Sequence, residues 1–112
     1  MIFYGLKTCD TCRKAQKDLT AVGQEFDIVD VRADGVSAAQ LANWTEKTDW
    51  QKLLNTRSTT WRGLDDGDKA DVTREKAVAL MAAHPTLIKR PVIEDGEKLY
   101  VGWSAETKTA LL

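Results

Sequence analysis

The chain has 112 residues, of which 43% are hydrophobic and 29% charged, a composition typical of one globular domain with a single core. Its formal net charge of −1 gives no bulk electrostatic reason to bind nucleic acid or an anionic membrane surface. The longest uninterrupted apolar stretch, residues 77–83, is too short to span a bilayer. The first residues lack the basic flank and cleavage site of a signal peptide, so we expect a cytoplasmic location.

The start of the chain predicts a strand followed by a helix, with two cysteines at the junction. Residues 1–4 form a short apolar run, which is typical of a buried strand. Beyond the cysteines, Ala15 and Leu19 lie four positions apart and indicate one apolar face of a helix. Cys9 is therefore expected about at the helix start. Cys12 would lie one turn away on the same side, close enough to form a disulfide with Cys9.

A C-x-x-C pair at a strand–helix junction is the arrangement of thioredoxin-like redox sites. The N–H groups and dipole of a helix start favour a thiolate, and so would the flanking charges of Lys7 and Arg13. One alternative is that the pair are two small apolar residues packed in a helix start. Another is zinc, which needs about four ligands. Beyond Cys9 and Cys12 the chain offers no further cysteine and only His84, so no metal site is predicted.

The next apolar stretch, residues 24–31, predicts a second strand that is mostly buried. Gly23 just before it would end the first helix with a left-handed cap. The resulting β-α-β unit would have parallel strands, because a helical crossover returns the chain in the same direction. The pair Asp34-Gly35 then marks a turn.

A helical insert is predicted over about residues 36–84. Ser37 opens a capping box for one helix, Asp49 can cap a second, and residues 73–84 have the periodicity of a third. The tryptophans of the first two helices are expected to be core residues rather than platforms for a ligand. From residue types alone, the polar stretch 55–62 favours a solvated loop.

The last third of the chain predicts a β-hairpin and a helix. Two apolar runs within residues 87–101 are joined by Asp95-Gly96, a strong signal for a two-residue turn, and Ser104 can cap a final helix. Without the insert, the order is the βαβ plus ββα pattern of a thioredoxin-like α/β fold with a mixed four-stranded sheet. We therefore predict a single domain over residues 1–112.

Three blocks of the sequence together resemble the arsenate reductase/Spx (ArsC/Spx) family, in particular its Spx and YffB-like branch. They are Cys9-Asp10-Thr11-Cys12-Arg13 preceded by Tyr4-Gly5, then Leu53-Leu54-Asn55-Thr56-Arg57, and finally Ile88-Lys89-Arg90-Pro91. Residues 54–62 look most like the YffB-like members. The match covers essentially the whole chain, and a helical insert between the halves of a thioredoxin fold is what this family would show.

The resemblance implies that Cys9 holds the position of the family's catalytic cysteine. It also implies that Arg57 and Arg90 match two arginines that face this cysteine, which overrides the loop interpretation of Arg57. Two guanidinium groups would favour a thiolate and could bind an oxyanion or a carboxylate of glutathione. Arg90-Pro91 would correspond to the cis-proline loop that thioredoxin folds place beside the active cysteine.

The predicted activity is that of a thiol–disulfide oxidoreductase with no bound cofactor and with glutathione as co-substrate. Cys9 would attack a disulfide or an oxidised substrate, and Cys12 or glutathione would release the product. The expected substrate-binding residues are Lys7, Arg13, Arg57, Arg90 and Pro91. The expected partners are glutathione or another small thiol or disulfide, with no membrane and no direct nucleic-acid contact, and the protein is expected to be a monomer.

Two other functions stay open. An Spx-like regulator would bind the C-terminal domain of the RNA polymerase α subunit and would use Cys9 and Cys12 as a redox switch. Arsenate reductases of this kind carry a third arginine after the hairpin, where this chain has Gly102-Trp103-Ser104, so an arsenate oxyanion would lose one charge partner. Many YffB-like proteins have only the first cysteine. Cys12 therefore makes an internal disulfide possible and puts strict dependence on glutathione in doubt.

Overall fold

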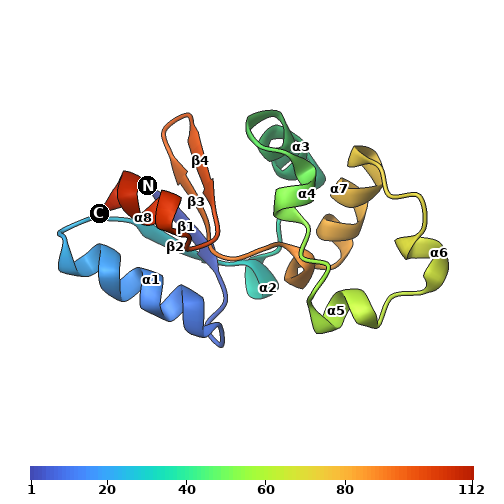
Figure 1. The fold of residues 1–112 in the computed structure, drawn as a ribbon, viewed down its shortest axis with the longest axis horizontal. Helices are drawn as coiled ribbons and strands as arrows, with labels where there is room; N and C mark the ends of the chain where they lie inside the picture. The colour runs from blue at the N-terminus through green and yellow to red at the C-terminus, as the bar shows by residue number, and fades with distance from the viewer. The chain divides into compact units, whose positions relative to one another are not determined.

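The computed structural model describes all 112 residues, which divide into two compact units. Unit 1 consists of Met1–Asp34 and Arg90–Leu112, so it contains both ends of the chain, blue and red in Figure 1. Unit 2 is the intervening segment, Gly35–Lys89, and the predicted insert at about residues 36–84 falls within it. None of the helices is long and apolar enough to cross a membrane.

Unit 1 is built on a four-stranded sheet. Its strands are β1 (Ile2–Gly5), β2 (Asp27–Asp30), β3 (Val92–Asp95) and β4 (Lys98–Val101), in the spatial order β2-β1-β3-β4. β1 runs parallel to β2, while β3 runs antiparallel to both β1 and β4. The sheet is therefore mixed, and the predicted α/β thioredoxin-like fold is confirmed.

Two helices, α1 (Asp10–Ala21) and α8 (Ala105–Leu111), lie on the same side of this sheet (Figure 1). A buried apolar cluster joins the sheet to both helices. Phe3 of β1 and Ile93 of β3 are its members from the sheet. The helices contribute Cys12, Ala15, Leu19 and Leu111. The predicted apolar face of the first helix, Ala15 and Leu19, is fully buried in this cluster.

The second strand is shorter and more exposed than predicted. Only Asp27–Asp30 of the expected strand over residues 24–31 form β2, and the side chain of Ile28 is 58% exposed. Val31 is buried but begins a short helix, α2 (Val31–Asp34). The apolar content of the stretch suggested burial on both faces. As an edge strand, however, β2 has only one neighbour in the sheet.

The hairpin between β3 and β4 is confirmed, but its turn lies one residue later than predicted. Asp95 still pairs with Lys98, so the two-residue loop is Gly96-Glu97 rather than Asp95-Gly96. Gly96 has a φ of 62°, in the left-handed region that such two-residue loops require and glycine adopts without strain.

Unit 2 has one isolated β-bridge, between Leu54 and Ile88, and no strand of the sheet. Its helices are α3 (Ala38–Lys47), α4 (Trp50–Leu53), α5 (Thr59–Arg62), α6 (Asp66–Lys69), α7 (Arg74–Ala83) and the 3-10 helix η1 (Pro85–Leu87). The predicted caps of α3 and α4 are confirmed, because Ser37 and Asp49 accept backbone N–H groups of the first turns. The solvated loop expected over residues 55–62 is partly wrong. Ser58 accepts the N–H of Trp61 at 3.1 Å and so begins α5.

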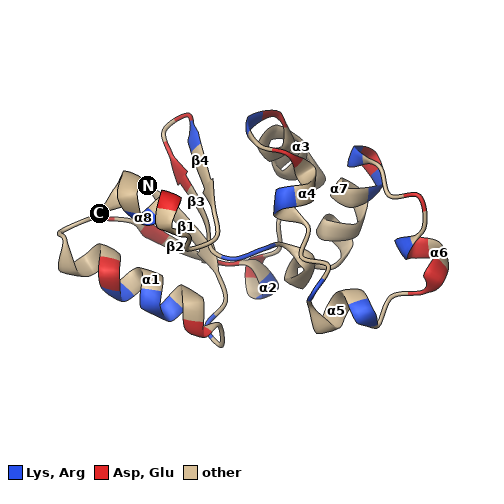
Figure 2. Cartoon of the chain, viewed as in Figure 1, with Lys and Arg blue, Asp and Glu red and all other residues tan.

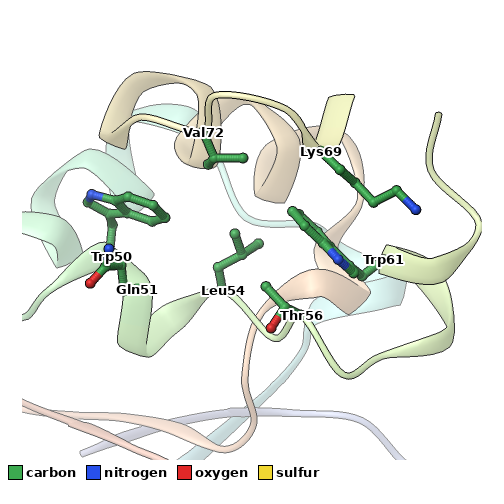
Figure 3. Close-up of a pocket in the computed structure, with 7 residues that line it drawn as sticks. All are labelled: Trp50, Gln51, Leu54, Thr56, Trp61, Lys69 and Val72. Carbon is green, nitrogen blue, oxygen red and sulfur yellow. The ribbon is translucent and has the colours of Figure 1, made fainter. Parts of the chain in front are cut away.

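The tryptophans of unit 2 differ in their burial. Trp44 is fully buried, as predicted for a core residue. Trp50 and Trp61 are only half-buried and stand on opposite sides of a hollow of ≈ 360 Å³, with Leu54 between them and Val72 across from it (Figure 3). Trp50 is therefore not the core residue that the helix pattern predicted. Its partner in the hollow, Trp61, comes from α5, which the pattern did not indicate.

Candidate active site

Cys9 lies at the N-cap of α1, where the sequence predicts it. Its Sγ accepts a hydrogen bond from the backbone N–H of Cys12 at 3.4 Å. Its own N–H donates to the carbonyl of Leu6 at 3.2 Å, and its carbonyl accepts the N–H of Arg13 at 3.1 Å. These main-chain hydrogen bonds thus fix the position of Cys9, and its sulfur lies beside the N–H groups of the helix start. Such N–H groups favour a thiolate.

Cys12 faces the opposite environment, because its side chain is fully buried in the core of unit 1. β1 passes close to it: a Cβ added at Gly5 would lie 3.0 Å from Cys12 Sγ and 2.9 Å from Phe3 Cε1. Glycine at position 5 therefore leaves the space that the Cys12 thiol occupies. The two cysteines are both free in the structure.

The two thiols have opposite pKa shifts. Burial raises the pKa of Cys9, but hydrogen bonds from the side chain and backbone of Cys12, with the charge of Arg90, outweigh it and bring this pKa below its usual 9.0. Burial, and to a smaller extent the hydrogen bond to Cys9 and its charge, raise the pKa of Cys12 to about 12. Cys9 is thus the thiol that ionises first, and Cys12 stays protonated when Cys9 is ionised.

Arg90 and Pro91 form a second side of the site. Their peptide bond is cis, as the family resemblance implied. The guanidinium of Arg90 lies close enough to Cys9 to lower its pKa both by charge and by a hydrogen bond. Pro91 is buried, and its carbonyl accepts the N–H of Gly102 at 2.7 Å, which ties this loop to the segment after β4. The predicted pair of Cys9 and Arg90 is brought together.

Lys7 and Arg13 have other neighbours. The N–H of Ala33 lowers the pKa of Asp30 most, and the charge and N–H of Lys7 contribute to the same shift, so Lys7 lies beside Asp30. Arg13 is largely exposed and pairs with Asp10 at 3.3 Å. We predicted that both cations would act on the Cys9 thiolate. The cation that lowers its pKa is Arg90, which is distant in sequence.

Asp30 is a residue of this region that the sequence did not indicate. It ends β2 and pairs with Gly5 in the register of the two parallel strands. Its carboxylate accepts the N–H groups of Arg32 and Ala33 at 2.9 and 3.0 Å. The predicted β-α-β unit was the signal that could have indicated Asp30, because the carboxyl ends of parallel strands meet at one edge of a sheet.

Arg57 belongs to unit 2 and is exposed. Its N–H donates to Asn55 Oδ1 at 3.1 Å, and its carbonyl accepts from the guanidinium of Arg62 at 3.3 Å. Its role at Cys9, which the resemblance implies, stays a prediction. No three His, Cys, Asp or Glu side chains of the structure come together as possible ligands of a metal ion.

Residues 4–111 match the model of the ArsC family. The chain is 40% identical over 101 residues to a protein of Haemophilus influenzae, across 90% of this chain and 89% of that one. A solved structure of a YffB protein covers 99% of this chain and 97% of its own, with a TM-score of 0.93 and 40% identity. The global transcriptional regulator Spx 2 of Lactococcus lactis is 26% identical over 111 residues, across 97% of this chain and 83% of its own length.

Proposed function

Because the chain belongs to the ArsC family, we propose that it is a thiol–disulfide oxidoreductase in which Cys9 is the nucleophile. The observation that carries this proposal is the opposite shift of two thiol pKa values within one turn of a helix. A thiolate attacks sulfur, whereas a thiol does not. The pair therefore supplies one thiol that ionises more readily than an ordinary cysteine and, beside it, one that stays protonated.

In the first step, the Cys9 thiolate attacks one sulfur of a substrate disulfide. A bond between Cys9 and that sulfur forms as the substrate's S–S bond breaks, and the second substrate sulfur leaves as a thiolate that takes up a proton. In the second step, either Cys12 or a glutathione thiolate attacks the mixed disulfide. Attack by Cys12 releases the bound substrate thiol and leaves a Cys9–Cys12 disulfide. Attack by glutathione on the substrate sulfur forms a glutathione–substrate disulfide as the bond to Cys9 breaks, and so regenerates the Cys9 thiolate.

Cys12 has a route to the second step despite its raised pKa. Once Cys9 is in a mixed disulfide, its negative charge is gone, and with it two of the causes that raise the pKa of Cys12. Burial remains, and it keeps Cys12 from reacting with sulfur atoms in solution. The backbone N–H of Cys12 already donates to the sulfur of Cys9 at 3.4 Å, so Cys12 lies next to that atom and needs no exposure to attack it.

Glutathione is the proposed co-substrate, with Arg57, Arg90, Pro91, Lys7 and Arg13 as the residues that would bind it. Replacing Arg57 or Arg90 by alanine should remove one charge-assisted contact and cost about 1.5–3 kcal/mol of binding free energy. Calorimetry with glutathione measures this directly. Equal affinity in the wild type and both variants would assign these arginines no part in binding.

The proposal is tested by treating the wild type, Cys9→Ser and Cys12→Ser with oxidised glutathione and following each cysteine by mass spectrometry. The Cys9 adduct should accumulate in Cys12→Ser and be transient in the wild type, which should end with an internal disulfide and no free thiol. Cys9→Ser should form no appreciable adduct. A lasting adduct on wild-type Cys9 beside reduced Cys12 would mean a monothiol mechanism. Faster modification of Cys12 would overturn the choice of nucleophile.

A second candidate is a redox-sensing regulator. The observation in its favour is the similarity to the transcriptional regulator Spx 2, which extends over 97% of this chain. Such a regulator would bind the C-terminal domain of the RNA polymerase α subunit. A pull-down with that domain, using reduced and oxidised protein, separates the two functions. Retention that depends on the redox state of Cys9 and Cys12 would favour the regulator, and absence of retention the enzyme.

Arsenate reduction is the least favoured activity. The segment that carries a third arginine in arsenate reductases is Gly102-Trp103-Ser104 here, and the indole N–H of Trp103 donates to Asp18 Oδ2 at 3.2 Å. No guanidinium is contributed by this segment to an oxyanion at Cys9. We expect the protein to reduce a small disulfide much faster than arsenate in assays with the same glutathione supply.

A further inference from the structure

A hollow of ≈ 520 Å³ in unit 1 is lined by side chains of both charges. α1 contributes Arg13 and Gln16, β2 and α2 contribute Asp30 and Asp34, and Lys7 comes from the segment before Cys9. Both basic and acidic residues occur on α1 and on α2 (Figure 2). The exposed apolar side chain of Ile28 also lines this space, which we call the charged hollow.

The main chain of Cys9 is bonded to two residues of the charged hollow, although Cys9 itself does not line it. Its N–H donates to Leu6 and its carbonyl accepts from Arg13, at 3.2 and 3.1 Å, and both of these residues line the hollow. The hollow also opens where Gly5 pairs with Asp30, at the carboxyl ends of two parallel strands. Ligands of α/β proteins commonly bind beyond this edge of the sheet. The volume is within the range of ordinary small-molecule sites.

The lining selects for a particular ligand chemistry. A ligand carboxylate would find its donors in the guanidinium of Arg13 and the ammonium of Lys7, whereas a ligand ammonium would find carboxylates at Asp30 and Asp34. A ligand with only one charge would satisfy only one of the two sets. The carboxylate of Asp30 is available in its ionised form, because the N–H groups of Ala33 and Arg32 and the charge of Lys7 hold its pKa low.

We propose that the charged hollow binds the amino-acid end of the thiol substrate, an ammonium and a carboxylate on one carbon, while the substrate's sulfur lies at Cys9. This inference rests on the proposed function, since it needs Cys9 to exchange disulfides. It assigns a substrate-binding role to Gln16, Asp30 and Asp34 and makes Lys7 and Arg13 part of one charge-selective site. The disulfide exchange is the first step of the proposed function: an S–S bond forms between Cys9 and the substrate as the substrate's own S–S bond breaks.

The test compares four disulfides that differ in charge: cystine, cystamine, dithiodipropionate and hydroxyethyl disulfide. With each disulfide, we measure the rate at which the protein loses its first free thiol. This rate is divided by the rate at which the same disulfide reacts with free glutathione, which corrects for the intrinsic reactivity of that disulfide. Cystine carries both charges and should exceed each singly charged probe by roughly three- to tenfold. Neutral hydroxyethyl disulfide reports the reactivity of Cys9 alone.

Two substitutions should separate the charges. Asp30→Asn should slow cystine and cystamine by roughly three- to tenfold and leave dithiodipropionate unslowed, while Arg13→Gln should slow cystine and dithiodipropionate but not cystamine. All rates are taken relative to hydroxyethyl disulfide in the same variant. Asparagine at position 30 still accepts the N–H groups of Arg32 and Ala33, so the start of α2 is kept.

Matched controls remove the same charge outside the hollow. The control variants are Asp27→Asn and Lys14→Gln. Asp27 lies on the same strand as Asp30, and Lys14 is next to Arg13 on α1, but neither residue lines the hollow. Both should keep the wild-type preference for cystine. If they change the rates as much as Asp30→Asn and Arg13→Gln do, the preference reflects net charge and the inference is wrong.

The two proposals fail in distinguishable ways. If no disulfide reacts at Cys9, the oxidoreductase function is wrong and the inference falls with it. If all four react at corrected rates that do not depend on charge, the oxidoreductase function stands and the binding site for the amino-acid end is refuted.

Discussion

The two units of the molecule are specified over very different distances in sequence. In unit 2, four helices begin at side chains that bond an N–H only two or three residues away: Ser37, Asp49, Ser58 and Thr73. In unit 1, the sheet pairs the two ends of the chain, as in Phe3 with Ile93. The hydroxyl of Tyr4 also donates to Glu94 Oε1 at 2.5 Å, ninety positions away. The proposed redox chemistry belongs to the unit that depends on distant pairing.

The start of α1 is the one place where both kinds of specification coincide. Cys9 caps its helix locally, as a serine does in unit 2, but its sulfur also receives the charge of Arg90 from the far end of the chain. The pKa of this local cap is therefore lowered first by its neighbour Cys12 and further by a tertiary contact with Arg90. Four pairs of substitutions test this contrast between the units.

The largest expected effects come from the two cores. Phe3 in unit 1 and Trp44 in unit 2 are both fully buried, so replacing either by alanine should cost about 3–5 kcal/mol of unfolding free energy. If residues 1–112 are a single domain, both variants should lower the midpoint of one shared transition in urea. Fluorescence, to which unit 2 contributes three of the four tryptophans, and thiol accessibility, which reports unit 1, should then coincide. Two separate transitions would contradict the single domain.

Two glycines give the next effect, with opposite signs. A Cβ at Gly5 would lie 2.9–3.0 Å from Phe3 and Cys12, so Gly5→Ala should overpack unit 1 and cost about 1–3 kcal/mol. Gly67 in α6 has nothing within 4 Å of such a Cβ, so Gly67→Ala should stabilise the protein by about 0.4–1 kcal/mol. Thermal or urea unfolding measures both. Equal destabilisation by the two substitutions would show that the space beside Cys12 is not the cause.

Two helix caps should separate folding from chemistry. Ser37 accepts the N–H of Gln40 at 3.1 Å, so Ser37→Ala should cost about 1 kcal/mol. Cys9→Ser keeps an acceptor at the cap of α1, so its unfolding free energy should stay within about 0.5 kcal/mol of the wild type. Its disulfide exchange should nevertheless be abolished. A Cys9→Ser protein as destabilised as Ser37→Ala would mean that the sulfur has a structural role that serine cannot supply.

The smallest effect concerns the pH dependence of alkylation. A thiolate forms as pH rises through the thiol pKa, so Cys9 should reach half of its maximal rate with iodoacetamide below pH 9.0. Arg90→Gln removes a charge that favours the thiolate and should move this midpoint upward, slowing alkylation at neutral pH. Cys12 should stay unmodified until the pH approaches about 12. Lys14→Gln, a charge change elsewhere on α1, should leave the midpoint in place.

The sequence by itself determined the features that depend on short-range contacts. The spacing of Cys9, Ala15 and Leu19 located the helix start and its buried face, and Ser37, Asp49 and Ser104 located three more helix starts. These predictions held because a cap and the N–H that it accepts are two or three residues apart. The α/β order followed, because the β-α-β crossover and the hairpin are also local patterns.

Only the tertiary structure decided which residues share an edge of the sheet. It placed β2 at the edge and so exposed Ile28, and it moved the hairpin turn to Gly96-Glu97. It also brought Arg90 to Cys9 and Asp30 to Lys7. The physical reason is that strand neighbours are chosen by pairing over the whole chain, and that the electrostatic environment of a thiol depends on distance in space rather than in sequence.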